Sequence, residues 1–300
     1  MKALENCRLC PRRCGVNRLN GERGFCGAGR EVRIARAALH FWEEPCISGS
    51  SGSGTVFFSN CTMKCVYCQN YEVSTNNLGY AVTEEELAEI FLDLQRQGAN
   101  NINLVTPTHY VPQIIAALLI AGANGMVLPV VYNTGGYELP ETIEMLCGHV
   151  DIYMPDFKYY DNKTAARYSK APDYLEHAAA ALDSMYHQVG TPELDQNGIM
   201  RRGMIIRHLM LPGRLSDTVH IINYIHKHFG DKVYFSLMNQ YTPVRHIEGI
   251  ERLNGRLDIR AYRAAVDLCR RLGMERVFVQ DGEAASESFI PEFTGTKGHL

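Results

Sequence analysis

The amino-acid pattern predicts an α/β fold, a partial (open) β/α barrel of about six parallel units that follows a small N-terminal cysteine-rich segment. From residue 54 onward, apolar and β-branched runs alternate with helical patterns, as in parallel strands joined by crossover helices. Six or seven such units are too few for a closed eightfold barrel. We therefore divide the chain into residues 1–53, the cysteine-rich segment and its lead-in, and residues 54–300, the barrel domain.

The predicted elements follow one another along the barrel domain. Thr83 and Glu86 have the spacing of a capping box, and Gly98 ends the helix that begins there. Further helices are expected at about 111–121, 138–147, 178–187, 216–229 and 258–272. Strands are expected at 55–60, 101–105, 127–133, 150–154, 203–209 and 232–237, with a last one at 276–280.

Composition narrows the class of protein. Apolar residues make up 46% of the chain and charged residues 21%, which is ordinary for a soluble globular protein. The net charge of −3 gives no electrostatic reason to expect nucleic acid or a membrane surface as partner. The N-terminus has no signal-peptide core, and the longest apolar run, 114–121, is far shorter than the roughly 20 residues that span a bilayer. We expect a cytoplasmic protein.

Ten cysteines in such a chain point to metal, cluster or redox chemistry rather than disulfides. Cys61, Cys65 and Cys68 lie within eight residues, directly after the first predicted strand. Three thiolates can hold three corners of a cubane iron–sulfur cluster, whereas structural sites usually take four ligands. The loop therefore predicts a site whose open position a substrate or cofactor occupies.

Four more cysteines, Cys7, Cys10, Cys14 and Cys26, have the density of a second, four-ligand site. Thiolates suit zinc or an iron–sulfur cluster there, and the spacing does not choose between them. Cys46 is expected to be a small buried residue, with a role as a fourth ligand as the alternative.

Polar residues gather where the predicted strands end, at Thr106 and His109, Asn133 and Thr134, Asp156 and Lys158, Arg207 and His208, and Asn239 and Gln240. In β/α folds, ligands bind at the carboxyl ends of the strands. Five such strand ends that face one mouth, together with the cysteine loop, predict a binding site.

The spacing CxxxCxxC, with the aromatic residue Tyr67 before the last cysteine, resembles the signature of the radical S-adenosylmethionine (SAM) superfamily. Residues 65–70, 154–158 (MPDFK) and 207–213 (RHLMLPG) are similar to motifs of the pyruvate formate-lyase activating enzymes. Residues 7–26 and 43–49 resemble a subgroup of activating-enzyme homologues whose substrates are largely unassigned.

The resemblance implies an anaerobic oxidoreductase. A [4Fe–4S] cluster on Cys61, Cys65 and Cys68 would bind SAM and cleave it reductively to methionine and a 5′-deoxyadenosyl radical, which abstracts hydrogen from the substrate. A reductant such as flavodoxin or ferredoxin would supply the electron. A protein substrate, the glycyl site of a glycyl-radical enzyme, is one expectation, and pyruvate formate-lyase itself is not favoured. A non-catalytic iron–sulfur electron-transfer or scaffold protein is the main alternative. A zinc-dependent nucleic-acid module at residues 1–30 is another.

The resemblance also implies roles for single residues. Tyr67 would lie against the adenine, and Arg207 would meet the carboxylate or the ribose of SAM. Asp156 and Lys158 would serve the methionyl and ribose end or a monovalent cation beside it, with Asn133, Thr134 and Met154 next to that cation. The related enzymes have a glycine-rich "GGE" stretch where this chain has Thr106, Thr108 and His109, one of which would replace its contact. They also have an aspartate in place of Asn133 and "PYH" in place of residues 239–241.

Overall fold

The computed structural model describes residues 2–280 and 293, and it places ten strands of this part of the chain in one sheet. The order is β10-β9-β8-β6-β5-β4-β2-β1-β3, with β7 paired to β8. The strands are β1 Val32–His40, β2 Ser53–Phe58, β3 Tyr80–Val82, β4 Ile102–Val105, β5 Val130–Thr134, β6 Ile152–Pro155, β7 Glu193–Leu194, β8 Met200–Leu209, β9 Tyr234–Met238 and β10 Val277–Val279.

The run from β2 to β10 is parallel throughout, and β1 and β3 extend it with antiparallel pairs at the β2 edge. Within the described residues, the outermost strands β10 and β3 are not paired with each other, so the barrel is open. The prediction of a partial parallel barrel is confirmed. Every residue of β2, β5 and β6 is buried, as expected for parallel strands that are covered on both faces.

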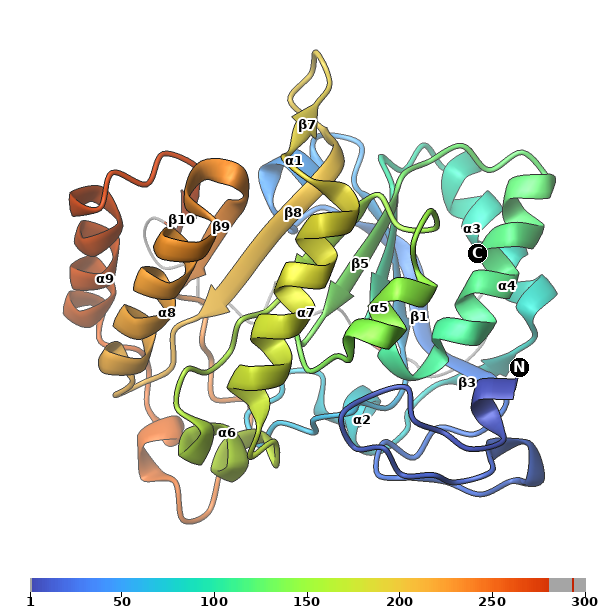
Figure 1. Ribbon diagram of the computed structural model, residues 1–300, viewed down its shortest axis with the longest axis horizontal. Helices are drawn as coiled ribbons and strands as arrows, with labels where there is room; N and C mark the ends of the chain where they lie inside the picture. The colour runs from blue at the N-terminus through green and yellow to red at the C-terminus, as the bar shows by residue number, and fades with distance from the viewer. Residues whose placement is uncertain (1, 281–292, 294–300) are drawn as a thin grey trace.

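Crossover helices cover the outer face of the sheet, and Figure 1 shows them in a row in front of the strands. The helix α3 begins with the predicted capping box, in which Thr83 and Glu86 exchange hydrogen bonds. The helices are α1 Pro45–Ser48, α2 Tyr71–Ser74, α3 Glu84–Arg96, α4 Val111–Ala123, α5 Pro140–Met145, α6 Asn162–Ser169, α7 Tyr174–Val189, α8 Leu215–His228 and α9 Ile259–Arg271.

Several predicted elements differ from the structure. The lead-in contains β1, which pairs with β2, and the proposed division at residue 53/54 falls within β2. The predicted strand at 127–133 begins only at Val130, because Val127 is 84% exposed in the turn after α4. The helix α6 was not predicted, and α7 begins four residues earlier than expected.

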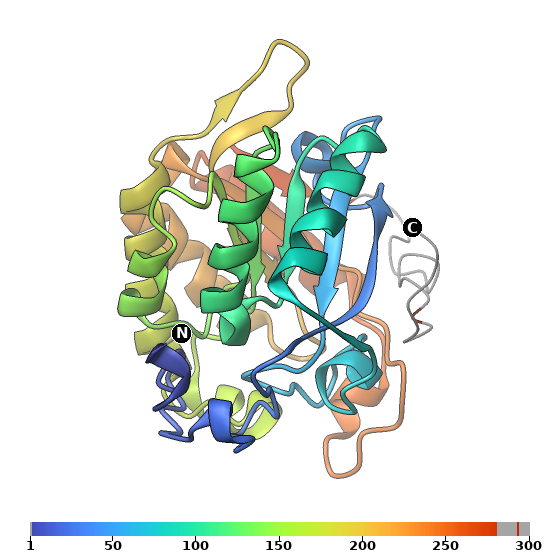
Figure 2. The ribbon, with the colours of Figure 1, turned by 90° about the vertical axis from the view of Figure 1, so that its right-hand side faces the viewer.

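The two ends of the barrel carry different segments. The N-terminal segment lies, together with α2 and α6, at the end to which β5 and β8 point (Figures 1 and 2). The helix α1 and the β7 turn lie at the opposite end. Within residues 2–280, none of the helices combines the length and the apolar character that crossing a bilayer requires.

Candidate active site

The cysteine loop connects β2 to α2 at the carboxyl end of β2. The loop is tight, because the Cys68 N–H donates to the carbonyl of Cys65 (3.1 Å) and Lys64 adopts the left-handed conformation (φ 53°). Cys61, Cys65 and Cys68 all line one cavity of about 280 Å³. The local fold therefore directs three thiols to one space.

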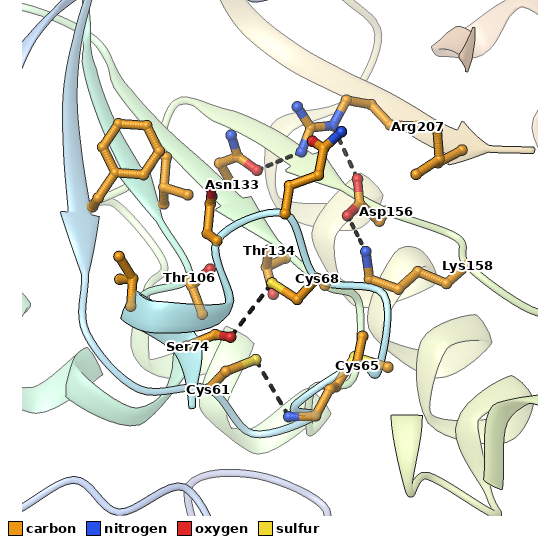
Figure 3. A pocket seen from close by; sticks show the side chains of 18 of the residues that line it. Cys61, Cys65, Cys68, Ser74, Thr106, Asn133, Thr134, Asp156, Lys158 and Arg207 are labelled. Atoms are coloured by element: carbon orange, nitrogen blue, oxygen red, sulfur yellow. Dashed lines mark hydrogen bonds and ion pairs between the residues drawn. The ribbon is translucent and has the colours of Figure 1, made fainter. Parts of the chain in front are cut away.

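Each sulfur of the loop accepts a hydrogen bond from a nearby group, and Figure 3 shows those to Cys61 and Cys68. The donors are the Met63 N–H to Cys61 (3.4 Å), the Ser169 hydroxyl to Cys65 (2.9 Å) and the Ser74 hydroxyl to Cys68 (3.4 Å). Burial raises the pKa of all three thiols. Bare thiols at this place are therefore neutral, and bound iron would supply the positive charge that favours thiolates.

Polar side chains from the strand ends complete the cavity wall (Figure 3). The structure brings together nearly all of the predicted SAM-binding residues around it, namely Tyr67, Thr106, Thr108, Asn133, Thr134, Asp156, Lys158 and Arg207. The ends of β4, β5, β6 and β8 each contribute at least one of them, as the parallel topology predicts.

Asp156 is the centre of an ion network at this wall. One of its carboxylate oxygens accepts from Lys158, and the other accepts from Arg207 Nε (3.0 Å). Arg207 also donates to Asn133 Oδ1 (2.6 Å). Burial raises the pKa of Asp156, but the neighbouring charges of Lys158 and Arg207 outweigh burial and hold that pKa below its usual range. Asp156 is therefore an ionised carboxylate inside the cavity.

Two adjacent glutamates that sequence reasoning did not assign a role also reach Arg207. Glu43 accepts from Arg207 Nη1 (3.1 Å), and a Glu44 oxygen lies 4.0 Å from the same atom. Burial raises the pKa of both glutamates, although the charge of Arg207 opposes this effect. They lie in the segment between β1 and α1. The available signals were the acidic pair itself and the resemblance of residues 43–49 to the activating-enzyme subgroup, neither of which indicates Arg207 as a partner.

Glu138 is a second buried acid that sequence analysis missed. It is completely buried, and it accepts hydrogen bonds from the hydroxyl groups of Thr108 (2.6 Å) and Thr134. Burial raises the pKa of Glu138 to about 7, while the two threonine hydrogen bonds act in the opposite direction. Glu138 thus orients two hydroxyl groups of the cavity wall.

Thr106 and Tyr67 have distinctive environments. Thr106 has φ of 60°, a conformation that is costly for a β-branched residue and typical of functional sites. Tyr67 lines the cavity, and its hydroxyl oxygen is 2.7 Å from that of Tyr159. This contact holds the Tyr67 side chain, and with it the end of the cysteine loop, against Tyr159.

Two predicted site residues lie elsewhere. His109 lines a second cavity and not the first. Its Nε2 is 2.8 Å from the Ser59 carbonyl oxygen, and burial lowers its pKa to about 3. Met154 is completely buried in an apolar cluster, one layer along β6 from the cavity. Of the other strand-end residues, Gln240 lines the cavity, whereas His208 is buried between the Phe157 carbonyl and Thr218.

The second cavity belongs to the N-terminal segment. Cys7, Cys10, Cys14 and Cys26 all line it, together with Arg18. Across residues 2–280 and 293, no three His, Cys, Asp or Glu side chains are close enough to chelate one metal ion together. This holds for Cys61, Cys65 and Cys68 as well, so in both cavities the sulfurs surround a space without meeting at a single point. Cys46 is buried in the same apolar cluster as Met154, as expected for a small core residue.

Comparison with known proteins agrees with this site. Residues 55–192 match the model of the radical SAM superfamily, a region that includes the cysteine loop. A relative from Methanocaldococcus jannaschii, itself an uncharacterized protein, is 30% identical over 285 residues, which are 92% of this chain and 77% of the relative.

Solved structures with lower similarity include SuiB of Streptococcus suis (13% identity, TM-score 0.46) and methylornithine synthase (13% identity, TM-score 0.45). The alignments cover 73% and 78% of this chain, respectively, and 46% and 74% of those proteins, so the chain spans about half the length of SuiB. The family match and the M. jannaschii relative show that this chain belongs to the radical SAM superfamily.

Proposed function

We propose that this protein is a SAM-cleaving oxidoreductase of the activating-enzyme type, with a [4Fe–4S] cluster on Cys61, Cys65 and Cys68. When bound, the cluster supplies the electron that cleaves SAM to methionine and a 5′-deoxyadenosyl radical, which abstracts hydrogen from the substrate. One observation carries the proposal: the three thiols share their cavity with polar strand ends, and its described lining includes no fourth cysteine. A ligand from solution would complete the cluster.

The residues around the cavity suit the functional groups of SAM. SAM carries an ammonium group, a carboxylate and ribose hydroxyl groups. Asp156 supplies a carboxylate acceptor for the ammonium or the ribose. Lys158 and Arg207 supply donors for the carboxylate, and Arg207 is pre-oriented by Asp156 and Glu43. Thr106 and Thr108 line the cavity and His109 does not. Because the Thr108 hydroxyl already donates to Glu138, Thr106 is the better-placed replacement for the missing glycine-rich contact.

The same geometry bears on the predicted monovalent cation. Both carboxylate oxygens of Asp156 already accept from basic side chains, and Asn133 Oδ1 accepts from Arg207. Met154 is in the neighbouring apolar layer. Each carboxylate oxygen can accept a further hydrogen bond, so these contacts leave Asp156 able to accept from SAM, and the monovalent cation stays a prediction.

Apolar side chains, among them Phe57, Phe58 and Met63, line part of the cavity beside the polar strand ends. A radical formed in such a space is kept from solvent and directed to a bound substrate. By the motif resemblance, we propose that the substrate is a glycyl site on a partner protein, that flavodoxin or ferredoxin is the reductant, and that the setting is the anaerobic cytoplasm, where thiols remain reduced.

Anaerobic turnover tests this function. The protein is reconstituted with iron and sulfide, reduced with dithionite and given SAM, and 5′-deoxyadenosine is measured by chromatography. We expect product from the wild type and from Cys46→Ala, whose thiol lies outside the cavity, and none from Cys65→Ala. An intact cluster that yields no 5′-deoxyadenosine would instead support the electron-transfer or scaffold function.

A second assay addresses the substrate class. Candidate glycyl-radical enzymes are mixed with the reduced protein and SAM, and the glycyl radical is sought by electron paramagnetic resonance (EPR). A radical on the partner that depends on Cys65 supports the activating-enzyme assignment. If 5′-deoxyadenosine forms but none of the partners acquires a radical, a small-molecule substrate replaces this part of the proposal.

A further inference from the structure

The N-terminal segment contains a buried positive charge without an anionic partner. Arg18 is 1% exposed, and its guanidinium donates to the carbonyls of Gly29 (2.9 Å) and His109 (2.6 Å). Within the described chain, no carboxylate lies within 4.0 Å of Arg18. A buried charge is costly unless an opposite charge accompanies it, and neutral carbonyls supply only part of that compensation.

The guanidinium faces the cavity of the four cysteines. Arg18 Nη1 lies 3.9 Å from Cys7 Sγ, and Arg18 lines the same cavity as Cys10, Cys14 and Cys26. Thiols are neutral, but thiolates bound to a metal are not. Four thiolates with Zn²⁺, or with a [4Fe–4S]²⁺ core, carry a net charge of about −2 by simple addition. Either centre would provide the missing counter-charge.

The backbone around these sulfurs has features that are typical of metal–thiolate sites. The Phe25 N–H donates to Cys14 Sγ (3.4 Å), and the Ala28 N–H donates to Cys26 Sγ (3.5 Å). Gly24 has no side chain, and a Cβ there would lie 2.7 Å from Cys14 Sγ. N–H groups that point at sulfurs stabilise the charged ligands of metal centres.

We propose that Cys7, Cys10, Cys14 and Cys26 hold a second, four-thiolate metal centre whose negative charge is paired with the buried Arg18. The inference does not depend on SAM cleavage, since it concerns a separate cavity. The sulfurs surround a space and do not meet at one point, so their arrangement does not choose between zinc and an iron–sulfur cluster. The test therefore offers iron with sulfide and zinc separately.

The second centre is also connected to the first loop. Arg12, between Cys10 and Cys14, donates from Nε to the Thr62 carbonyl (3.0 Å) within the cysteine loop. Its Nη2 donates to the Ser169 carbonyl (3.3 Å), and the Ser169 hydroxyl in turn donates to Cys65 Sγ. A metal that fixes residues 7–26 would thereby steady the loop of the first cluster.

Metal content tests the proposal without any measurement of activity. The full chain with Cys61→Ala, Cys65→Ala and Cys68→Ala is loaded anaerobically with iron and sulfide or with zinc, desalted and analysed. We expect about four iron and four sulfide, or about one zinc, per chain. Adding Cys10→Ala and Cys26→Ala should remove this metal, whereas adding Cys46→Ala and Cys147→Ala should not. A triple variant that is folded by circular dichroism yet retains neither metal overturns the proposal.

Arg18 provides a second and independent test. The triple variant with Arg18→Leu should release its metal to a chelator at least tenfold more readily than the triple variant that keeps Arg18. The triple variant with Arg18→Lys should retain most of its metal. If Arg18→Leu releases metal at the rate of its parent, the pairing of Arg18 with the centre is refuted. If both Arg18 variants unfold, the comparison between Cys10/Cys26 and Cys46/Cys147 still decides whether the centre exists.

Discussion

Replacing Glu138 by glutamine isolates one buried titration within the site. Glu138 is completely buried beside Thr108 and Thr134, and burial raises its pKa to about 7 from 4.5. Glutamine keeps an oxygen that can accept both threonine hydrogen bonds, but it cannot ionise. Glu138→Gln therefore removes a pH dependence and leaves the shape of the wall in place.

The sign and size of the effect follow from the pKa. The folded chain holds the Glu138 proton more tightly than the unfolded chain does. The stability that this provides is complete below pH 4.5, falls as the pH rises and is lost above pH 7. The full loss is roughly 2.5 × 1.36, or about 3 kcal/mol, and about 2 kcal/mol of it falls above pH 5.5. Relative to wild type, Glu138→Gln should therefore gain about 2 kcal/mol between pH 5.5 and pH 8.5.

Denaturant unfolding of equally metal-loaded proteins at the two pH values measures this gain. Glu141→Gln, in the helix that follows, is the matched control, because the Glu141 side chain is 72% exposed and should show no such gain. If the unfolding free energies of Glu138→Gln and wild type change in parallel with pH, the assignment of the buried titration to Glu138 is refuted.

Three further predictions concern other contacts in and around the site. Ser169→Ala removes a hydrogen bond to Cys65 and should lower the reduction potential of the reconstituted first cluster by some tens of millivolts, at roughly 40 mV per kcal/mol. An EPR-monitored redox titration measures this potential, and an unchanged value would contradict the contact. Arg207→Met leaves Glu43 buried without its cation and should cost about 3–5 kcal/mol in unfolding experiments, with Arg207→Lys less affected; equal stability of all three proteins contradicts the network. Thr106→Gly relieves the left-handed conformation and should raise stability by up to about 1 kcal/mol, while Thr106→Ser should not, and a loss with glycine would argue against strain.

Much of the fold was predictable because the signals are local. The capping box at Thr83 and Glu86 fixed the start of α3, and the alternation of strand and helix patterns identified the parallel strands, including β10. The cysteine loop and the strand-end residues around it came from spacing and topology together. In a parallel sheet, side chains at the ends of adjacent strands must meet.

The parts that were missed depend on contacts between distant segments. Strand β1 carries Arg33 and Arg36 and is antiparallel, so its place is set by pairing with β2 and not by its own pattern. Glu43 and Arg207 are 164 residues apart, and a single glutamate gives no sign of such a partner. His109 was misplaced because the turn from Thr108 to Tyr110 is a short 3₁₀-helix, in which the His109 ring contacts the Ser59 carbonyl and the residue lines the second cavity.

The most direct test of the central claim is whether SAM itself completes the cluster on Cys61, Cys65 and Cys68. The reduced protein is mixed with SAM that carries ¹⁷O at the carboxylate or ¹⁵N at the amino group. Electron–nuclear double resonance then measures contact between these atoms and the iron. To exclude signals from a second centre, the measurement is repeated with Cys10→Ala/Cys26→Ala. We expect couplings from both labelled groups in both proteins. A reduced cluster on the loop whose spectrum is unchanged by SAM would contradict the account.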